Sequence, residues 1–313
     1  MTLKGPPGRV LVTGGAGFIG SHVAEGLRRL GWQVEALDNL STGDPANLPG
    51  DVPLHVADLR SDEEINGVFA ATGFDFVVHC AAQTSVERSM KSPALDHAVN
   101  VGGTQRLLKA ALESGVQRFV LISSGGAIYG DTEAAADEDT MPAPRSYYGL
   151  DKYAAEEFVR ASGVPSAILR PSNVYGPRQR ADAEGGVVAI FHSRLRGDQP
   201  LQVHGDGRQT RDFVHVSDVT SAVIAALSAE DDVLWNVASG EATTILQLAE
   251  HMATEIGRVL HIDYLPARPG DVQSSLLSPA RLLATGLWAP PLTLRQGLAR
   301  LFRESAPAPV VPS

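Results

Sequence analysis

The sequence has little cysteine, no long apolar run and no excess of basic residues. The single cysteine, Cys80, excludes an internal disulfide and fits a reducing compartment, so we expect a cytoplasmic protein. No apolar run approaches the roughly 18 residues of a membrane span, and residues 1–9 lack the apolar core of a signal peptide. The net charge of −10 argues against a general nucleic-acid binder. We therefore expect neither nucleic acid nor a membrane as a partner.

Metal chemistry has no support either, because the histidines show no metal-ligand spacing. His79, His204 and His215 are interpreted as packing or hydrogen-bonding residues. A net negative charge still allows one phosphorylated ligand, since a few local arginines can hold a diphosphate on an acidic protein.

Short β-branched runs alternate with helical stretches in the first half of the chain. We expect strands at 9–13, 32–38, 53–57, 74–80, 118–123 and 166–170, and helices at 21–30, 93–114, 148–161 and 246–256. This alternation predicts an α/β protein with a Rossmann-type doubly wound parallel sheet. We expect residues 1–170 to form this domain, completed by about 212–240. Residues 171–313 are expected to be mainly a smaller C-terminal substrate-binding region.

A glycine-rich turn follows the first expected strand and opens the first helix. Gly14, Gly17 and Gly20 have a G-x-x-G-x-x-G spacing, with Phe18 and Ile19 between the last two glycines. Such glycines let the backbone approach a dinucleotide pyrophosphate at a helix N-terminus. The sequence therefore predicts that residues 1–170 bind a dinucleotide.

An acidic residue lies where it can select the dinucleotide. Asp38 ends the second expected strand, 18 residues after Gly20. A carboxylate there can bind the adenosine ribose hydroxyls and would repel a 2′-phosphate, which favours NAD over NADP. Asp58, after the third strand, is either an adenine contact or an ordinary loop residue.

Tyr148 and Lys152 lie four residues apart, on one face of an expected helix. Tyrosine is normally a poor base, with a pKa near 10. A neighbouring ammonium and an oxidised nicotinamide both favour the phenolate. The pair is therefore our candidate for general base and activator.

The ordered series of motifs resembles the extended short-chain dehydrogenase/reductase family, and within it the nucleotide-sugar epimerases. The resemblance covers nearly the whole chain. It is carried by residues 13–20, 38–43, 79–83, 123–130, 148–152, 170–178, 205–207, 211–213 and 268–271.

The resemblance implies roles for particular residues. Tyr148 is the base, Lys152 its activator, and a serine after the fifth strand assists at the sugar hydroxyl. The family's usual Ser/Thr position holds Gly125, so we assign Ser124 and keep Ser123 as the alternative. The implied NAD-binding residues are Gly14, Gly17, Phe18, Ile19, Gly20, Asp38, Asn39, Ser41, Thr42, Gly43, Asp58, Leu59, Ala81, Ala82, Gln83, Asn100, Ser123, Tyr148 and Lys152.

The same segment distinguishes this chain from relatives with other activities. Similar sugar 4,6-dehydratases carry an Asp-Glu pair just after the Ser/Thr, and similar UDP-glucuronate decarboxylases usually carry a Glu there. Gly125 and Gly126 occupy these positions here. Of the reactions that the resemblance implies, this leaves oxidation and re-reduction at C4 of the sugar, the reaction of a 4-epimerase.

The substrate implied by the resemblance is a UDP-hexose, with charged contacts on its diphosphate and few on its sugar. The implied substrate-binding residues are Ser85, Ser124, Tyr148, Asn173, Val188, Gln202, Arg211, Arg268 and Asp271. We favour UDP-glucose/UDP-galactose. UDP-glucuronate and UDP-N-acetylglucosamine remain alternatives; Arg180 is either a ligand for a glucuronate carboxylate or a solvated loop residue.

A non-catalytic NAD-binding regulator is the alternative function of another class. We also expect a homodimer, paired through helices 93–114 and 148–161.

Overall fold

The computed structural model describes residues 8–132, 134–182, 185–267, 272–289 and 291–304. Its main element is a seven-stranded sheet in which every neighbouring pair is parallel. In spatial order the strands are β10 (Val233–Val237), β6 (Ser166–Pro171), β5 (Arg118–Ile122), β4 (Phe76–His79), β1 (Arg9–Thr13), β2 (Gln33–Asp38) and β3 (Leu54–Val56). The order reverses between β1 and β4, which confirms the predicted doubly wound sheet.

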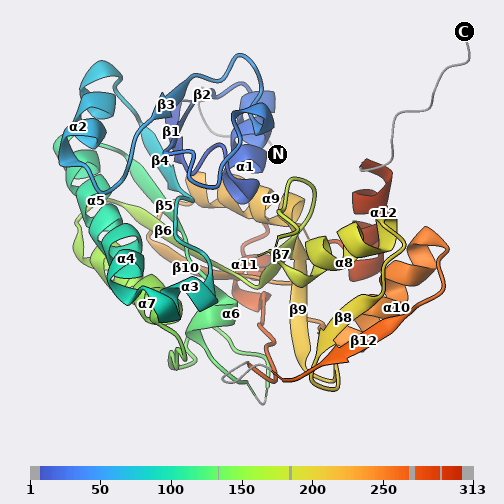
Figure 1. Ribbon diagram of the computed structural model, residues 1–313. Helices are drawn as coiled ribbons and strands as arrows, with labels where there is room; N and C mark the ends of the chain where they lie inside the picture. The colour runs from blue at the N-terminus through green and yellow to red at the C-terminus, as the bar shows by residue number, and fades with distance from the viewer. Residues whose placement is uncertain (1–7, 133, 183–184, 268–271, 290, 305–313) are drawn as a thin grey trace, which may run out of the picture.

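Helices cover both faces of this sheet (Figure 1). One face packs on α1 (Phe18–Arg29) and α9 (Val216–Leu227), whose apolar side chains share a core with the sheet. The other packs on α2 (Asp62–Ala71), α5 (Gly103–Glu113) and α7 (Tyr147–Ala161). Burial on both faces explains why the strands read as nearly continuous apolar runs.

The helix expected at 93–114 contains an irregularity. It begins as α4 (Pro93–His97), passes through a π-helical turn at Ala98–Gly102, and continues as α5. The hydroxyl of Thr104 donates to the carbonyl of Asn100 at 2.6 Å in this turn. Such turns often mark functional positions, and Asn100 is a predicted cofactor residue.

The second half of the chain builds a smaller unit with its own core. One sheet has the order β11 (Ala242–Thr244), β9 (Thr210–His215), β7 (Asn173–Tyr175), and another pairs β12 (Ile262–Leu265) with β8 (Leu201–His204). Helices α8 (Val187–Arg196), α10 (Ile245–Ile256) and α12 (Leu294–Glu304) pack with them around a separate apolar cluster. This unit lies on the right in Figure 1.

Short elements complete the described chain: a 3₁₀ turn at Pro45–Asn47, α3 (Val86–Lys91), α6 (Gly125–Ile128) and α11 (Ala280–Ala284). Strand β10 pairs with β6, and α9 covers the main sheet, so segments after residue 212 return to the first unit. The boundary between the two predicted domains stays a prediction. Among the described residues, no helix is long and apolar enough to cross a membrane.

Candidate functional site

The predicted cofactor residues gather where the parallel strands end. The glycine loop follows β1, Asp38 ends β2, Asp58 follows β3, Ala81 follows β4, and Ser123 follows β5. In parallel α/β sheets, ligands bind at this edge, next to the point where the strand order reverses. The topology therefore brings together residues that are far apart in sequence.

Close backbone packing requires glycine in the loop at the start of α1. Gly14 has φ +65°, and a Cβ there would lie 2.7 Å from the amide nitrogen of Ala81. A Cβ on Gly20 would lie 2.1 Å from the carbonyl oxygen of Gly14. Gly17 is the N-cap of α1, with no side-chain cap and no acidic residue in the first turn. The helix N-terminus is thus available to a pyrophosphate.

The Asp38 carboxylate is held in a fixed orientation by backbone donors. It accepts hydrogen bonds from the amides of Ala16 at 3.1 Å and Leu40 at 2.9 Å. Burial raises the pKa of Asp38, and these amide bonds oppose the rise. A Cβ on Gly43 would lie 2.9 Å from both carboxylate oxygens, so glycine keeps this approach open. The site fits the ribose contact expected for NAD.

Asp58 is committed to protein contacts. Its carboxylate accepts two hydrogen bonds from the Arg60 guanidinium, at 2.9 and 2.7 Å, one from the Arg60 amide at 2.9 Å and one from Asn39 at 3.0 Å. Hydrogen bonding to Arg60 holds the pKa of Asp58 well below its usual range. The structure thus favours the loop role, in which Asp58 fixes Asn39 beside Asp38. Leu59 is buried in the core, and its cofactor contact would come from its backbone.

The loop after β4 is fastened through Gln83. Asn100 accepts from the Gln83 amide at 2.9 Å and donates to its carbonyl at 3.0 Å. The Gln83 side chain bonds to both the amide and the carbonyl of Ser85. The Ser85 hydroxyl in turn accepts from the amide of Arg88 at the start of α3. This arrangement fixes the loop between the glycine turn and α7.

Tyr148 and Lys152 are both buried on α7. The ammonium of Lys152 donates to the carbonyl of Ile122 at the end of β5, at 2.8 Å. Burial lowers the pKa of Lys152 to about 8. Burial raises the pKa of Tyr148 to about 12, hydrogen bonding with Ser124 opposes this rise, and the charge of Asp96 adds to it. The phenol therefore needs positive charge from Lys152 and the nicotinamide to act as a base.

The two candidate serines have different environments. Ser123 is buried, and its hydroxyl donates to the carboxylate of Glu156 at 2.6 Å. Glu156 is fully buried and also accepts from Arg170 at 2.8 and 2.6 Å. Ser124 is partly exposed, and its side chain interacts with the phenol of Tyr148. This geometry supports Ser124 as the hydroxyl that assists Tyr148, and Ser123 as a structural residue.

Gly125 and Gly126 follow Ser124 in a space bounded by other segments. A Cβ on Gly125 would lie 2.2 Å from a methyl carbon of Leu277, so no acidic side chain fits there without moving Leu277. A Cβ on Gly126 would lie 3.3 Å from the amide oxygen of Asn173. Asn173, a predicted substrate residue, is therefore close to the catalytic segment.

Val188, Gln202 and Arg211, which are also predicted to bind substrate, lie in the smaller unit. Gln202 is exposed on β8, whereas the Val188 side chain is buried in the core beneath it. The guanidinium of Arg211, on β9, donates to the carbonyl of Thr210 at 2.9 Å. Arg268 and Asp271, and the turn expected at 268–271, lie outside the described residues.

The two arginines after Pro177 point to different partners. Arg178 has φ +67° and pairs with Glu25 on α1 at 2.6 Å. Arg180 pairs with Asp182 in its own loop, and its side chain is 58% exposed. The structure thus favours a solvated loop role for Arg180.

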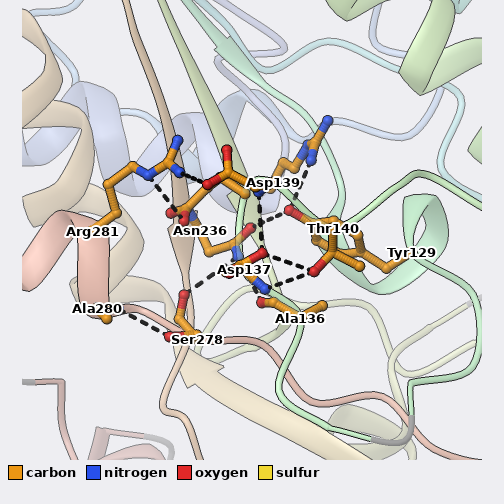
Figure 2. Close-up of polar contacts among 11 residues, drawn as sticks. Tyr129, Ala136, Asp137, Asp139, Thr140, Asn236, Ser278, Ala280 and Arg281 are labelled. Atoms are coloured by element: carbon orange, nitrogen blue, oxygen red, sulfur yellow. Dashed lines mark hydrogen bonds and ion pairs between the residues drawn. The ribbon is translucent and has the colours of Figure 1, made fainter.

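Sequence reasoning did not identify the segment at residues 272–278, which packs beside the catalytic loop. Its backbone bonds to Thr132, Ala136 and Thr210. Figure 2 shows the anchor: Asn236, from β10, accepts from the Tyr129 hydroxyl at 2.9 Å and donates to the carbonyls of Ala136 and Ser278. This anchor fixes residues 272–278 beside the catalytic loop.

Asp212 is a second residue that sequence reasoning did not single out. It is fully buried beside Arg211 and accepts from Ser172, Ser239 and Gly240. These bonds tie the strand carrying Arg211 to the ends of β6 and β10. In the sequence, Asp212 is marked only by its place next to Arg211, and the resemblance implies a role for the arginine alone.

Comparison with known proteins agrees with this geometry. Residues 10–238 match the family described as NAD dependent epimerase/dehydratase. The UDP-glucose 4-epimerase of Mycolicibacterium smegmatis is 37% identical over 93% of this chain and 96% of its own. The Thermotoga maritima UDP-glucose 4-epimerase, solved with UDP-glucose, is 36% identical with a TM-score of 0.92, covering 95% of this chain and 99% of its own.

A further solved structure concerns the cofactor. The Thermus thermophilus UDP-glucose 4-epimerase, in complex with NAD, is 39% identical with a TM-score of 0.90, covering 95% of this chain and 100% of its own. The open helix N-terminus and the oriented Asp38 carboxylate fit the same cofactor. The chain belongs to the NAD dependent epimerase/dehydratase family, which confirms its identification as an NAD-dependent nucleotide-sugar epimerase of the extended short-chain dehydrogenase/reductase type.

Proposed function

We propose that this enzyme interconverts the C4 epimers of a UDP-hexose, with UDP-glucose and UDP-galactose as its preferred pair. One observation carries the proposal: Tyr148 interacts with Ser124 and Lys152 binds the Ile122 carbonyl at the end of β5, on the same edge of the sheet as the glycine loop and the Asp38 carboxylate. A non-catalytic NAD-binding regulator would have no need for this arrangement. The named substrates of similar enzymes support UDP-glucose.

The residues present can carry out the proton transfers. Bound NAD would supply the hydride chemistry at the sugar C4, in both directions. Tyr148 removes the proton of the 4-hydroxyl, and Ser124 orients that hydroxyl toward the phenolate. Lys152, fixed by the Ile122 carbonyl, stabilises the phenolate by its charge. After the 4-keto sugar has rotated to present its other face, Tyr148 returns the proton to the C4 oxygen, which gives the other epimer.

The anchoring residues explain how the sugar can turn while the nucleotide stays bound. Arg211, with Arg268 and Asp271 from the resemblance, would hold the diphosphate and a ribose hydroxyl by charge-assisted bonds. Asn173, beside Gly126, would contact the substrate near the catalytic segment. Weak contacts to the hexose then allow either face of C4 to meet the cofactor.

Incubation with a panel of nucleotide-sugars tests this function. UDP-glucose, UDP-N-acetylglucosamine, UDP-glucuronate and dTDP-glucose are each incubated with the purified protein, and the products are analysed for C4 epimers. We expect the highest kcat/KM with UDP-glucose and no net consumption of NAD. Dehydrated or decarboxylated products would contradict the proposal, as would binding of every sugar without turnover.

We also propose a homodimer formed through α5 and α7. Both helices pack on the same face of the sheet, and Leu112 on α5 and Leu150 and Phe158 on α7 expose large apolar side chains. Such side chains are typical of a face that another chain covers. Light scattering at micromolar concentration should give twice the monomer mass, and Phe158→Glu should lower it; a monomeric parent protein would refute the proposal.

A further inference from the structure

Asp96, on α4 beneath the catalytic helix, is a fully buried carboxyl group that the mechanism does not use. Its Oδ1 accepts a hydrogen bond from the side-chain amide of Gln83 at 2.5 Å. Its Oδ2 is also buried and makes no hydrogen bond among the described residues. A buried carboxylate oxygen without a donor is costly, so this atom requires an explanation.

Another carboxyl group lies beside the Asp96 side chain. Asp151, on α7, lies within hydrogen-bonding reach of Asp96 and is itself buried. It stands between Tyr148 and Lys152 in the chain, and its other contact is with the exposed His97, whose Nδ1 lies 2.9 Å from its Oδ1. Two carboxyl groups in contact can form a hydrogen bond with each other only when one of them carries a proton.

Electrostatics favours the same arrangement. Two buried carboxyl groups in contact cannot both ionise at low cost, so one keeps its proton to a higher pH. Burial raises the pKa of Asp96 to about 6, and the contact with Asp151 acts in the same direction, whereas hydrogen bonding with Gln83 and with Asn100 opposes the rise. A protonated Asp96 can donate from Oδ2 to Asp151 while Oδ1 still accepts from Gln83.

We propose that Asp96 and Asp151 share one proton, and that this carboxyl pair is a positioning device joining the Gln83 loop to helix α7 beside Tyr148 and Lys152. The functional part of this inference rests on the proposed epimerase reaction. Through Gln83 the pair reaches Ser85 and the backbone held by Asn100. Through Asp151 it reaches the helix that carries the base. The loop and the base thereby keep a fixed separation.

The pair also controls a charge near the base. The ionisable groups that face it are Tyr148, Lys152 and His97. A negative charge on Asp96 raises the pKa of Tyr148 and also that of Lys152. Keeping Asp96 neutral therefore makes the phenol easier to ionise. Loss of the shared proton as the pH rises through about 6 would both add this charge and remove the link between the helices.

The variant Asp96→Asn tests the shared proton directly. Its amide oxygen can accept from Gln83 and its amide NH₂ can donate to Asp151, so it imitates the protonated acid at every pH. Glu63→Gln, an exposed position on α2, makes the same chemical change as a control. Unfolding of the NAD-loaded, full-length proteins by urea is measured between pH 5 and 8, together with kcat for UDP-glucose.

The sign of the stability effect follows from linkage. Because folding raises the pKa of Asp96, its protonated form stabilises the native state at low pH, and this stabilisation is lost as the pH rises through about 6. The stability of Asp96→Asn should therefore increase relative to the parent from pH 5 to 7, while Glu63→Gln follows the parent. Parallel curves for Asp96→Asn and the parent would overturn the shared proton.

The activity measurement tests the positioning role. The ratio of kcat for Asp96→Asn to that of the parent should rise several-fold between pH 6 and 8, and the ratio for Glu63→Gln should stay constant. A constant ratio for Asp96→Asn would overturn the positioning role. Absence of turnover in the parent would instead count against the proposed reaction, and the unfolding curves would still decide whether the proton is shared.

Discussion

The hydroxyl of Ser123 donates to the carboxylate of Glu156 at 2.6 Å in the protein interior. Glu156 is fully buried, and its carboxylate also accepts hydrogen bonds from Arg170 and Arg160. Ser123 is thus part of the support beneath β5 and α7, and the adjacent Ser124 is left to face Tyr148. Two neighbouring serines with different partners should respond differently to the same substitution.

Ser124→Ala should lower kcat with little change in stability, because it removes the group that orients the sugar hydroxyl. Ser123→Ala should lower the free energy of unfolding by about 1.5–3 kcal/mol, the usual cost of losing a hydrogen bond to a charged group. Urea unfolding and kcat are measured for both proteins. A larger loss of kcat in Ser123→Ala would move the catalytic assignment to Ser123.

Tyr148→Phe should lower kcat by roughly 10²- to 10⁴-fold, the range typical of general base catalysis, with little loss of nucleotide-sugar affinity. The ring and its packing are kept, and only the proton acceptor is removed. Binding is measured by calorimetry and turnover by product analysis. Activity within a few-fold of the parent would exclude Tyr148 as the base.

The rate should also depend on the charge of Lys152. Its pKa is lowered to about 8 by burial, so the ammonium that stabilises the phenolate is lost as the pH rises above that value. We expect kcat of the parent to decline between pH 8 and 10. Lys152→Met, which carries no charge at any pH, should be slow and should lack this decline. A parent rate that still rises through pH 10 would contradict the role of the ammonium.

The purified enzyme should carry NAD without added cofactor, because the proposed cycle restores the cofactor after each turnover. NAD is assayed in the supernatant after denaturation. Asp38→Ala should retain much less NAD, since a charged acceptor held by the Ala16 and Leu40 amides is lost. Asp51→Ala, an exposed position paired with Arg28, serves as the control. Equal retention in both variants would exclude Asp38 as a cofactor residue.

The first half of the fold could be predicted because its signals are local. Strand β1 at Arg9–Thr13 matches the prediction, and the helix expected at 21–30 is present as α1, which begins three residues earlier, at Phe18, and ends at Arg29. Gly14 and Asp38 could be assigned because their spacing follows from the sheet itself. The alternation of strands and helices needed no information from distant contacts.

The remaining features depend on contacts between residues far apart in sequence. The sequence around Asp58 is compatible either with a contact to adenine or with a bond to Arg60. Only the structure shows the bond to Arg60. Leu277 fills the space beside Gly125 from a segment about 150 residues away, which no local pattern reveals. The choice between Ser123 and Ser124 likewise required the position of Glu156 on another element.

The nature of the sugar C6 group gives the last prediction. A glucuronate carboxylate requires a cationic or multi-donor pocket, whereas a hydroxymethyl group does not. Arg180 was the candidate cation, but its guanidinium pairs with Asp182 and its side chain is mostly exposed. We therefore expect kcat/KM to be higher for UDP-glucose than for UDP-glucuronate. In Arg180→Ala this ratio should stay within about fivefold of its value in the parent, the factor that corresponds to an exposed ion pair worth about 1 kcal/mol or less. If glucuronate is preferred and Arg180→Ala removes that preference, the arginine must leave Asp182 when substrate binds, and the choice of glucose is wrong.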